Sequence, residues 1–106
     1  MKIIWSDFAS KMLKEIFLYY KENASMTVAK KIRDEIFKST KQLQHHPQLG
    51  QTELNLIQLN EGHRYLVERN YKIVYKQVTE GILITDIFDT RQDPQKINDE
   101  KRKPSW

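Results

Sequence analysis

The side chains best suited to chemistry in this sequence are three arginines in its second half. Arg64, Arg69 and Arg91 carry guanidinium groups, which bind phosphate or carboxylate through paired hydrogen bonds. They can converge only if the last strand lies beside the segment 64–76, and the short turn at 79–81 favours that arrangement. The alternative is that each arginine forms a surface ion pair with a nearby carboxylate. A phosphate-binding site therefore requires the three arginines to gather in one basic hollow.

Histidine and lysine side chains near these arginines are further candidates. His63 lies between a turn glycine and Arg64, so its imidazole could transfer a proton near neutral pH, or it could be a solvated hairpin residue. Lys72 and Lys76 could extend a positive face, or could form the exposed side of a half-buried strand. The sequence has no Gly-rich phosphate loop, no nucleophile elbow, no metal-ligand spacing and no cysteine. The pattern therefore indicates no metal and no organic cofactor.

Length and composition favour one small domain. The 106 residues carry a net charge of +4, and the 39% that are hydrophobic occur in periodic clusters, which favours a folded core over general disorder. We expect a single domain over residues 1–97 and a charged, flexible tail over residues 98–106. No apolar run approaches the roughly 20 residues of a membrane span, and the N-terminus does not read as a signal peptide. Because the chain lacks cysteine, a reducing cytosol fits best, and we expect a cytoplasmic protein that binds no membrane.

Apolar periodicity predicts two helices in the first half of the chain. A short strand over residues 2–5 is followed by apolar side chains at three- and four-residue spacing over residues 8–22, the pattern of an amphipathic helix. Ser25 or Thr27 can cap a second helix, which should end near residues 44–46 because a proline follows. The short link between them predicts an antiparallel helical hairpin.

The second half has the composition and alternation of strands. Residues 54–59 and 65–67 flank a turn whose glycine can adopt a positive φ, so they predict a β-hairpin. A strand over residues 71–76 leads to the turn at 79–81. The last strand, residues 82–88, is apolar at both parities, which indicates burial on both faces. The expected fold is α+β with the order β-α-α-β-β-β, a two-helix hairpin packed on a mainly antiparallel sheet.

Several short motifs run through these elements in a fixed order: Trp5-Ser6 with Ala9, Pro47 with Gly50, GHRYLVERNYKIVY at 62–75, and IFDTRQDP at 87–94. In this order and at this chain length, the set resembles the RelE/ParE superfamily of toxins from bacterial type II toxin–antitoxin modules, some of which are labelled plasmid-stabilisation proteins. The resemblance extends to about residue 97, and the family fold agrees with the element order derived above.

The resemblance implies a toxin held inactive by a cognate antitoxin, usually an acidic and partly disordered protein that folds around it. RelE-like members cut messenger RNA on the ribosome, and ParE-like members poison DNA gyrase. RNA cleavage requires a base, an acid and cationic stabilisation at one phosphate. Arg64 and Arg91 match phosphate-binding arginines of RelE-like members, and Arg69 could assist them. Together with Lys72, these arginines are the residues expected to bind the target or a phosphate.

The acid and base of a nuclease are harder to find. The stretch 53–59, where active relatives carry lysines or a glutamate, offers only Glu53, and Asp89 stands where many relatives have a histidine. His63 and Glu53 are the remaining catalytic candidates of an RNA endonuclease. This incomplete set favours a ParE-like toxin that inhibits growth by binding a target such as gyrase. The alternatives are a ribosome-dependent mRNA endonuclease and a non-toxic binding module or decayed toxin.

Overall fold

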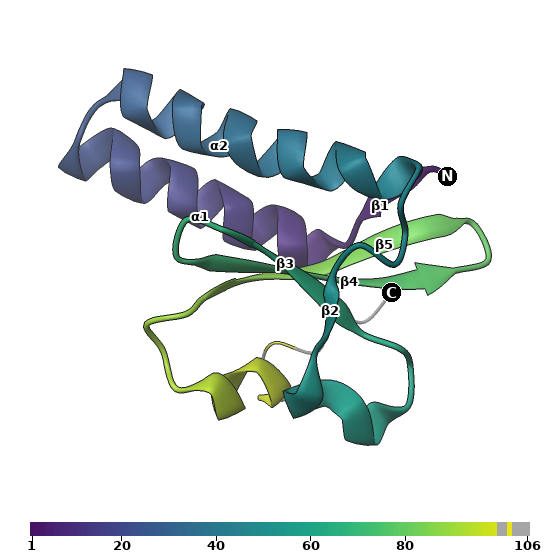
Figure 1. Ribbon diagram of the computed structural model, residues 1–106. Coiled ribbons are helices and arrows are strands. Elements are labelled where there is room, and N and C mark those ends of the chain that lie inside the picture. Colours follow the sequence, from purple (N-terminus) through teal and green to yellow (C-terminus); the bar gives the residue numbers. More distant parts are fainter. Residues whose placement is uncertain (100–101, 103–106) are drawn as a thin grey trace.

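The computed structural model describes residues 1–99 and 102, which form a layer of helices packed on one face of a sheet (Figure 1). The strand order in the sheet of these residues is β1-β5-β4-β3-β2. The expected α+β architecture is confirmed. Along the chain the elements are β1 (Ile3–Trp5), α1 (Asp7–Asn23), α2 (Met26–Lys41), the 3₁₀ helix η1 (Gln42–Gln44), β2 (Gln51–Thr52), the 3₁₀ helix η2 (Leu54–Leu59), β3 (Arg64–Glu68), β4 (Tyr71–Val78), β5 (Gly81–Asp89) and the 3₁₀ helix η3 (Pro94–Asn98).

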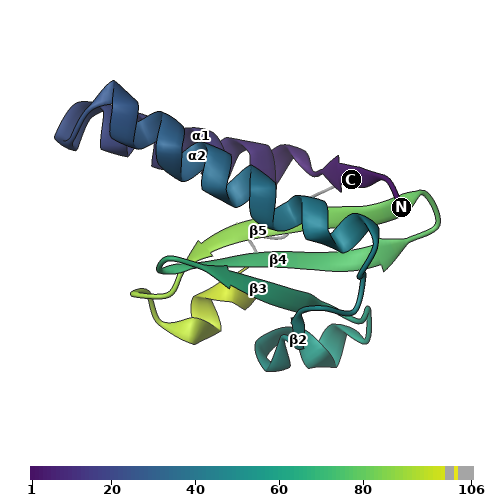
Figure 2. The ribbon, with the colours of Figure 1, turned by 45° about the horizontal axis from the view of Figure 1, so that its top comes forward.

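Side-chain caps fix where the two α-helices begin. The Ser6 hydroxyl accepts a hydrogen bond from the backbone N–H of Ala9 at 3.0 Å, and the Ser25 hydroxyl accepts one from that of Val28 at 3.1 Å. Both helices occupy the segments that periodicity predicts, and the short link makes them an antiparallel hairpin (Figure 2). Their buried apolar side chains, such as Ile36, share one core cluster with side chains of β4 and β5.

The sheet is mixed but mainly antiparallel. β5 pairs with β1 in parallel and with β4 in antiparallel orientation, and β3 pairs antiparallel with both β4 and β2. Residues 81–88 are all buried, which confirms that the last strand is covered on both faces. The helices cover one face, and η2 and η3 lie on the other (Figure 2). There, a second core cluster consists of Leu56, Val74, Phe88 and Ile97.

The predicted first hairpin is wrong. Residues 54–59 form η2 instead of a strand. The apolar spacing is ambiguous because Leu56 and Leu59, three residues apart, lie on the same side of a 3₁₀ helix and both pack toward the second core cluster. The tight hairpin joins β3 to β4, and Arg69 in its turn adopts a positive φ of 56°.

Arg102 is anchored on the sheet. Its guanidinium donates hydrogen bonds of 2.6 and 3.0 Å to the Asp86 carboxylate and lies 5.0 Å from the centre of the Phe88 ring. The buried Asp86 carboxylate of β5 therefore supplies the counter-charge of Arg102. Residues 100–101 and 103–106 of the predicted tail lie outside the described residues. Within the described part of the chain, no helix has the length and apolar character needed to cross a membrane.

Candidate functional site

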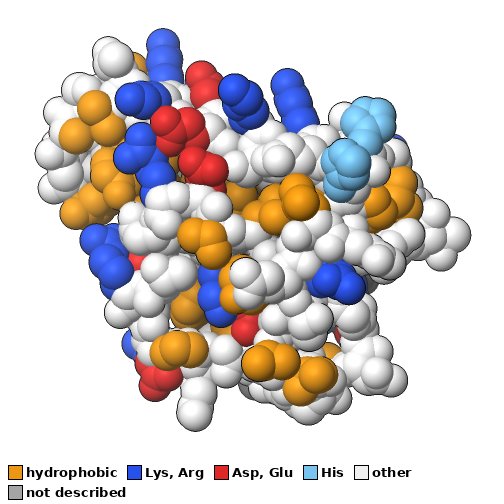
Figure 3. Space-filling view, in the orientation of Figure 1, with side chains coloured by type: hydrophobic (Ala, Val, Ile, Leu, Met, Phe, Trp, Pro, Cys, Tyr) orange, Lys and Arg blue, Asp and Glu red, His pale blue; other side chains and the backbone are white. Residues whose placement is uncertain are grey.

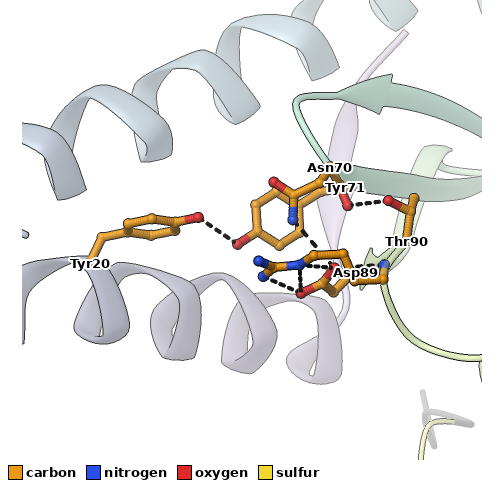
Figure 4. Close-up of polar contacts among 6 residues, drawn as sticks. Tyr20, Asn70, Tyr71, Asp89 and Thr90 are labelled. Atoms are coloured by element: carbon orange, nitrogen blue, oxygen red, sulfur yellow. Dashed lines mark hydrogen bonds and ion pairs between the residues drawn. The ribbon is translucent and has the colours of Figure 1, made fainter. Parts of the chain in front are cut away.

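The start of β4 and the end of β5 carry the first group of predicted site residues. In the register of the sheet Tyr71 pairs with Asp89, and Arg91 lies two residues after Asp89. The Asp89 carboxylate accepts hydrogen bonds from the Arg91 guanidinium at 2.7 and 3.0 Å, and from the Asn70 side-chain amide at 3.3 Å (Figure 4). These donors, the Arg91 guanidinium first among them, lower the pKa of Asp89 to about 2, and the carboxylate raises the pKa of Arg91. The structure therefore pairs Arg91 with its own nearby carboxylate.

A hollow of about 450 Å³ lies between this ion pair and α1. The Tyr71 hydroxyl lies 3.4 Å from that of Tyr20 (Figure 4). Burial raises the pKa of Tyr71, so this phenol is neutral at physiological pH. Among the residues that the structure describes, the charged side chains that line the hollow are two arginines and two carboxylates: Arg91, Arg102, Glu15 and Asp89. Its charge is therefore balanced, and it is not the strongly basic site that the sequence predicts.

The Asp89–Arg91 ion pair makes the stability of the fold depend on acid pH. The pKa of Asp89 is lowered from 3.8 to about 2, so its stabilising contribution is present above pH 3.8 and is lost as the pH falls toward 2. Asp89→Asn should remove this dependence. We expect the free energy of unfolding, measured with urea at a series of pH values, to fall less steeply over this range in Asp89→Asn than in the wild type. Equal slopes in the two proteins would contradict the ion pair's role.

Arg69 is bound to the helical layer. Its guanidinium donates hydrogen bonds of 2.6 and 3.2 Å to the carboxylate of Glu35 on α2. This contact lowers the pKa of Glu35 and raises that of Arg69. Arg69 lies at the same end of the sheet as Arg91, but each guanidinium has its own carboxylate partner.

Arg64 lies at the opposite end of β3. Its guanidinium donates a hydrogen bond of 2.8 Å to the carbonyl oxygen of Gly50, whose N–H donates one of 2.8 Å to the Tyr75 hydroxyl. Five residues of strand place the backbones of Arg64 and Arg69 about 16 Å apart. The prediction that the three arginines share one basic hollow is therefore wrong. Arg64 instead holds the loop that precedes β2.

The two predicted proton-transfer residues are buried in the loop layer. Glu53 is 1% exposed, and its carboxylate accepts hydrogen bonds from Lys72 at 2.8 Å and from the backbone N–H of Asn55 at 3.1 Å. His63 is 6% exposed, and its Nδ1 has no hydrogen-bond partner among the described residues. Burial, and next the nearby Lys76 charge, lower the pKa of His63, so it is neutral at neutral pH. Lys72 and Glu53 thus fasten η2 to the sheet, and neither points to an exposed catalytic site.

The partners of these side chains carry no local signal in the sequence. Glu35 lies 34 positions from Arg69, and Glu53 lies 19 positions from Lys72. The ion pair of Asp89 and Arg91, two positions apart, is one that spacing in the sequence could have indicated.

Comparison with known proteins identifies the family. The family model described as the ParE toxin of the type II toxin-antitoxin system, parDE, matches residues 3–94. The chain belongs to the ParE toxin family. The match confirms the predicted resemblance and includes every predicted site residue. The match ends at Pro94, so Arg102 lies beyond the matched residues.

A solved structure supports the ParE fold. The structure described as the chromosomal ParDE TA system from P. aeruginosa is similar, with a TM-score of 0.69 and 23% sequence identity, over 84% of this chain and 95% of that chain. At this identity the similarity concerns the fold, which agrees with the architecture above. No curated protein sequence matches the chain.

Proposed function

We propose that this ParE-family toxin arrests bacterial growth by binding DNA gyrase in the cytoplasm, and that a cognate antitoxin neutralises it. The observation that carries this proposal is the burial of Glu53 and His63, which are 1% and 6% exposed. A nuclease needs its base and acid within hydrogen-bond reach of the substrate. An RNA phosphate cannot reach either side chain in this structure, so the geometry supports binding over cleavage.

The placement of the cations supports the same proposal. Cleavage of RNA needs cationic groups and proton-transfer groups around one phosphate, whereas Arg64 and Arg91 lie at opposite ends of β3 and β4. Arg91 has a side chain that is 66% exposed, compared with 40% for Arg69 and 20% for Lys72. Of the predicted binding residues, Arg91 is therefore the one we retain as a contact to the target.

Expression without the antitoxin tests this function. We expect induced cells to stop growing and to activate their DNA-damage response, because a poisoned gyrase leaves broken DNA. The purified protein should inhibit supercoiling of relaxed plasmid by purified gyrase. Arg91→Ala should weaken this inhibition roughly tenfold, the effect of losing one well-placed interface arginine. Lys96→Ala, which removes an exposed cation on η3, should leave the inhibition unchanged.

Two other outcomes would replace the proposal. Growth arrest with cut ribosome-bound messages and intact DNA would assign an mRNA endonuclease, and Arg91→Ala should then abolish cleavage without unfolding the protein. Harmless expression would identify a non-toxic binding module or a decayed toxin.

The antitoxin part of the proposal has a separate test. The product of a small reading frame beside this gene should relieve growth arrest when it is co-expressed. A net charge of +4 on the toxin favours an acidic partner. If no neighbouring product relieves the arrest, neutralisation by a cognate antitoxin is wrong even where gyrase inhibition holds.

A further inference from the structure

The hollow of about 450 Å³ beside the Asp89–Arg91 ion pair lies against one face of α1 and is here called the α1–β5 hollow. The residues of α1 that line it are three and four positions apart, so they share one face of the helix: Met12, Glu15, Ile16 and Tyr19. The opposite wall comes from the start of β4, the end of β5 and the residues that follow β5: Tyr71, Ile87, Asp89, Arg91 and Gln92. This flank of α1 is distinct from the one that borders α2, where Leu13 and Phe17 line a separate hollow with residues of α2.

Tyr19 is an exposed aromatic side chain at the edge of the α1–β5 hollow. It is 55% exposed, yet its ring meets the Tyr20 ring edge to face, with the ring centres 5.2 Å apart. Tyr20 in turn lies beside Tyr71, with the two hydroxyl groups 3.4 Å apart (Figure 4). The ring contact restricts the rotamers of Tyr19, so less conformational entropy is lost when a partner packs on it. Tyr19 therefore has the exposure and the order of an aromatic anchor for another protein.

Arg91 stands on the wall of the α1–β5 hollow that faces α1. Its side chain is 66% exposed, and the Asp89 carboxylate accepts hydrogen bonds of 2.7 and 3.0 Å from its Nη2 and Nε atoms. This ion pair orients the guanidinium and offsets its charge, and it leaves Nη1 able to donate to an oxygen of a partner. Arginine and tyrosine are two of the residue types most enriched at the energetic centres of protein interfaces. The hollow places one of each on its two walls.

The charges around the α1–β5 hollow favour a protein partner over a nucleic acid. Arg91 is paired with Asp89, and Arg102 is paired with Asp86 at 2.6 Å. Within residues 1–99 and 102, the exposed Glu15 carboxylate has no cationic partner. A phosphate backbone would therefore meet an unpaired negative charge beside two arginines that already have carboxylate partners. On the face of the molecule seen in Figure 3, Lys and Arg side chains are interspersed with Asp and Glu side chains, not gathered into one basic patch.

We infer that the α1–β5 hollow binds a segment of gyrase that carries an apolar side chain next to a lysine or arginine. The apolar side chain would pack on Met12 and Ile16, beside the exposed Tyr19 ring. The lysine or arginine would lie beside Glu15, whose charge is unpaired, and a backbone carbonyl oxygen would accept a hydrogen bond from Arg91. The inference rests on the proposed function, because gyrase is the partner, and it adds a face of α1 to the contact already assigned to Arg91.

Binding of the purified protein to purified gyrase tests the inference, measured by calorimetry without DNA and alongside inhibition of supercoiling. Tyr19→Ala should bind roughly tenfold more weakly than the wild type, whereas Tyr19→Phe, which keeps the ring, should bind like the wild type. Glu15→Lys should also bind roughly tenfold more weakly, because its cation would repel the basic residue of the partner. Both side chains are exposed, so the fold should be retained, and circular dichroism of each variant checks this.

Matched control variants carry comparable changes outside the α1–β5 hollow. Leu18→Ala removes a 40% exposed apolar side chain that adjoins Tyr19 in sequence but projects from a different side of α1 and does not line the hollow. Glu80→Lys reverses an exposed charge in the turn before β5, at the opposite end of that strand from Asp89. Both control variants should bind gyrase like the wild type.

The failure of the inference can be told apart from the failure of the proposed function. If the wild-type protein neither binds gyrase nor inhibits supercoiling, the proposed function is wrong and the inference falls with it. If the wild type binds gyrase and both Tyr19→Ala and Glu15→Lys bind equally well, only the assignment of the hollow is wrong. If Glu80→Lys weakens binding as much as Glu15→Lys does, net charge governs binding and the hollow does not.

Other occupants of the α1–β5 hollow would also overturn the inference. Normal binding of Tyr19→Ala to gyrase together with weaker binding to duplex DNA would assign a nucleic acid. Normal binding to gyrase with loss of self-association, measured by sedimentation equilibrium, would assign a second copy of this chain. Loss of gyrase binding on replacing Leu54 and Ile57, which are 70% and 60% exposed on η2, with Tyr19→Ala unaffected, would place gyrase on the opposite face of the sheet.

Discussion

Gly81→Ala should detach β1 from β5 and lower the free energy of unfolding by about 4 kcal/mol, the combined scale of backbone strain and steric overlap. Gly81 has a φ of +149°, which side chains with a Cβ rarely adopt. A Cβ atom there would overlap the carbonyl oxygen of Lys2. That same oxygen accepts the hydrogen bond of 2.8 Å from the Ile82 N–H that begins the pairing of the two strands. Urea unfolding of the two proteins measures the difference.

Gly62→Ala is the matched control for this effect. Gly62 also has a positive φ, of 73°, but apart from Gly62 and its two chain neighbours no atom of the described residues lies within 4 Å of where its Cβ would be. Gly62→Ala should therefore lower the free energy of unfolding by only about 1 kcal/mol, which comes from the backbone conformation. If the two alanine variants lose similar free energies of unfolding, the effect of Gly81→Ala comes from backbone strain alone and not from the overlap with Lys2.

The elements with strong periodicity could be predicted from the sequence, and the segment with ambiguous periodicity could not. α1 and α2 show apolar side chains on one helical face, and β5 carries mostly apolar side chains on both of its faces. Residues 54–59 fit both a strand and a 3₁₀ helix, because their apolar positions satisfy either spacing. No sequence signal indicated that Arg69 lies in the turn with a positive φ, because arginine rarely adopts that conformation.

The site was harder to predict than the fold because it depends on register and on distant charges. Arg64 and Arg69 lie only five positions apart in sequence, yet the strand β3 between them places them at opposite ends of that strand. Glu35 binds Arg69 only because α2 crosses that end of the sheet. Arginine count and spacing therefore indicate that cations are present, but not whether those cations are free to bind a ligand.

Lys72→Met should lower the free energy of unfolding by about 3 kcal/mol, because it leaves a buried carboxylate without its cation. The Glu53 side chain is 1% exposed, and the Lys72 ammonium at 2.8 Å is its cationic partner. The lysine stem lies beside Tyr65, with its ammonium 4.3 Å from the ring centre, and methionine keeps most of that apolar packing. The loss should therefore come from the stranded charge, and it should loosen η2, which begins directly after Glu53. Urea unfolding at neutral pH measures the effect.

Two further variants separate the buried charge from the lost side chain. Lys72→Met/Glu53→Gln should recover a large part of the stability, because a neutral amide still accepts from the Asn55 N–H, 3.1 Å from Glu53 Oε1, and no charge remains buried. Arg69→Met removes a cation whose partner, Glu35, has a side chain 31% exposed and open to water, so it should cost at most about 1 kcal/mol. Two outcomes would contradict this role of Lys72. Lys72→Met could lower the free energy of unfolding by no more than Arg69→Met does, or the double variant could be no more stable than Lys72→Met. Either result would show that the buried Glu53 charge is stabilised without Lys72.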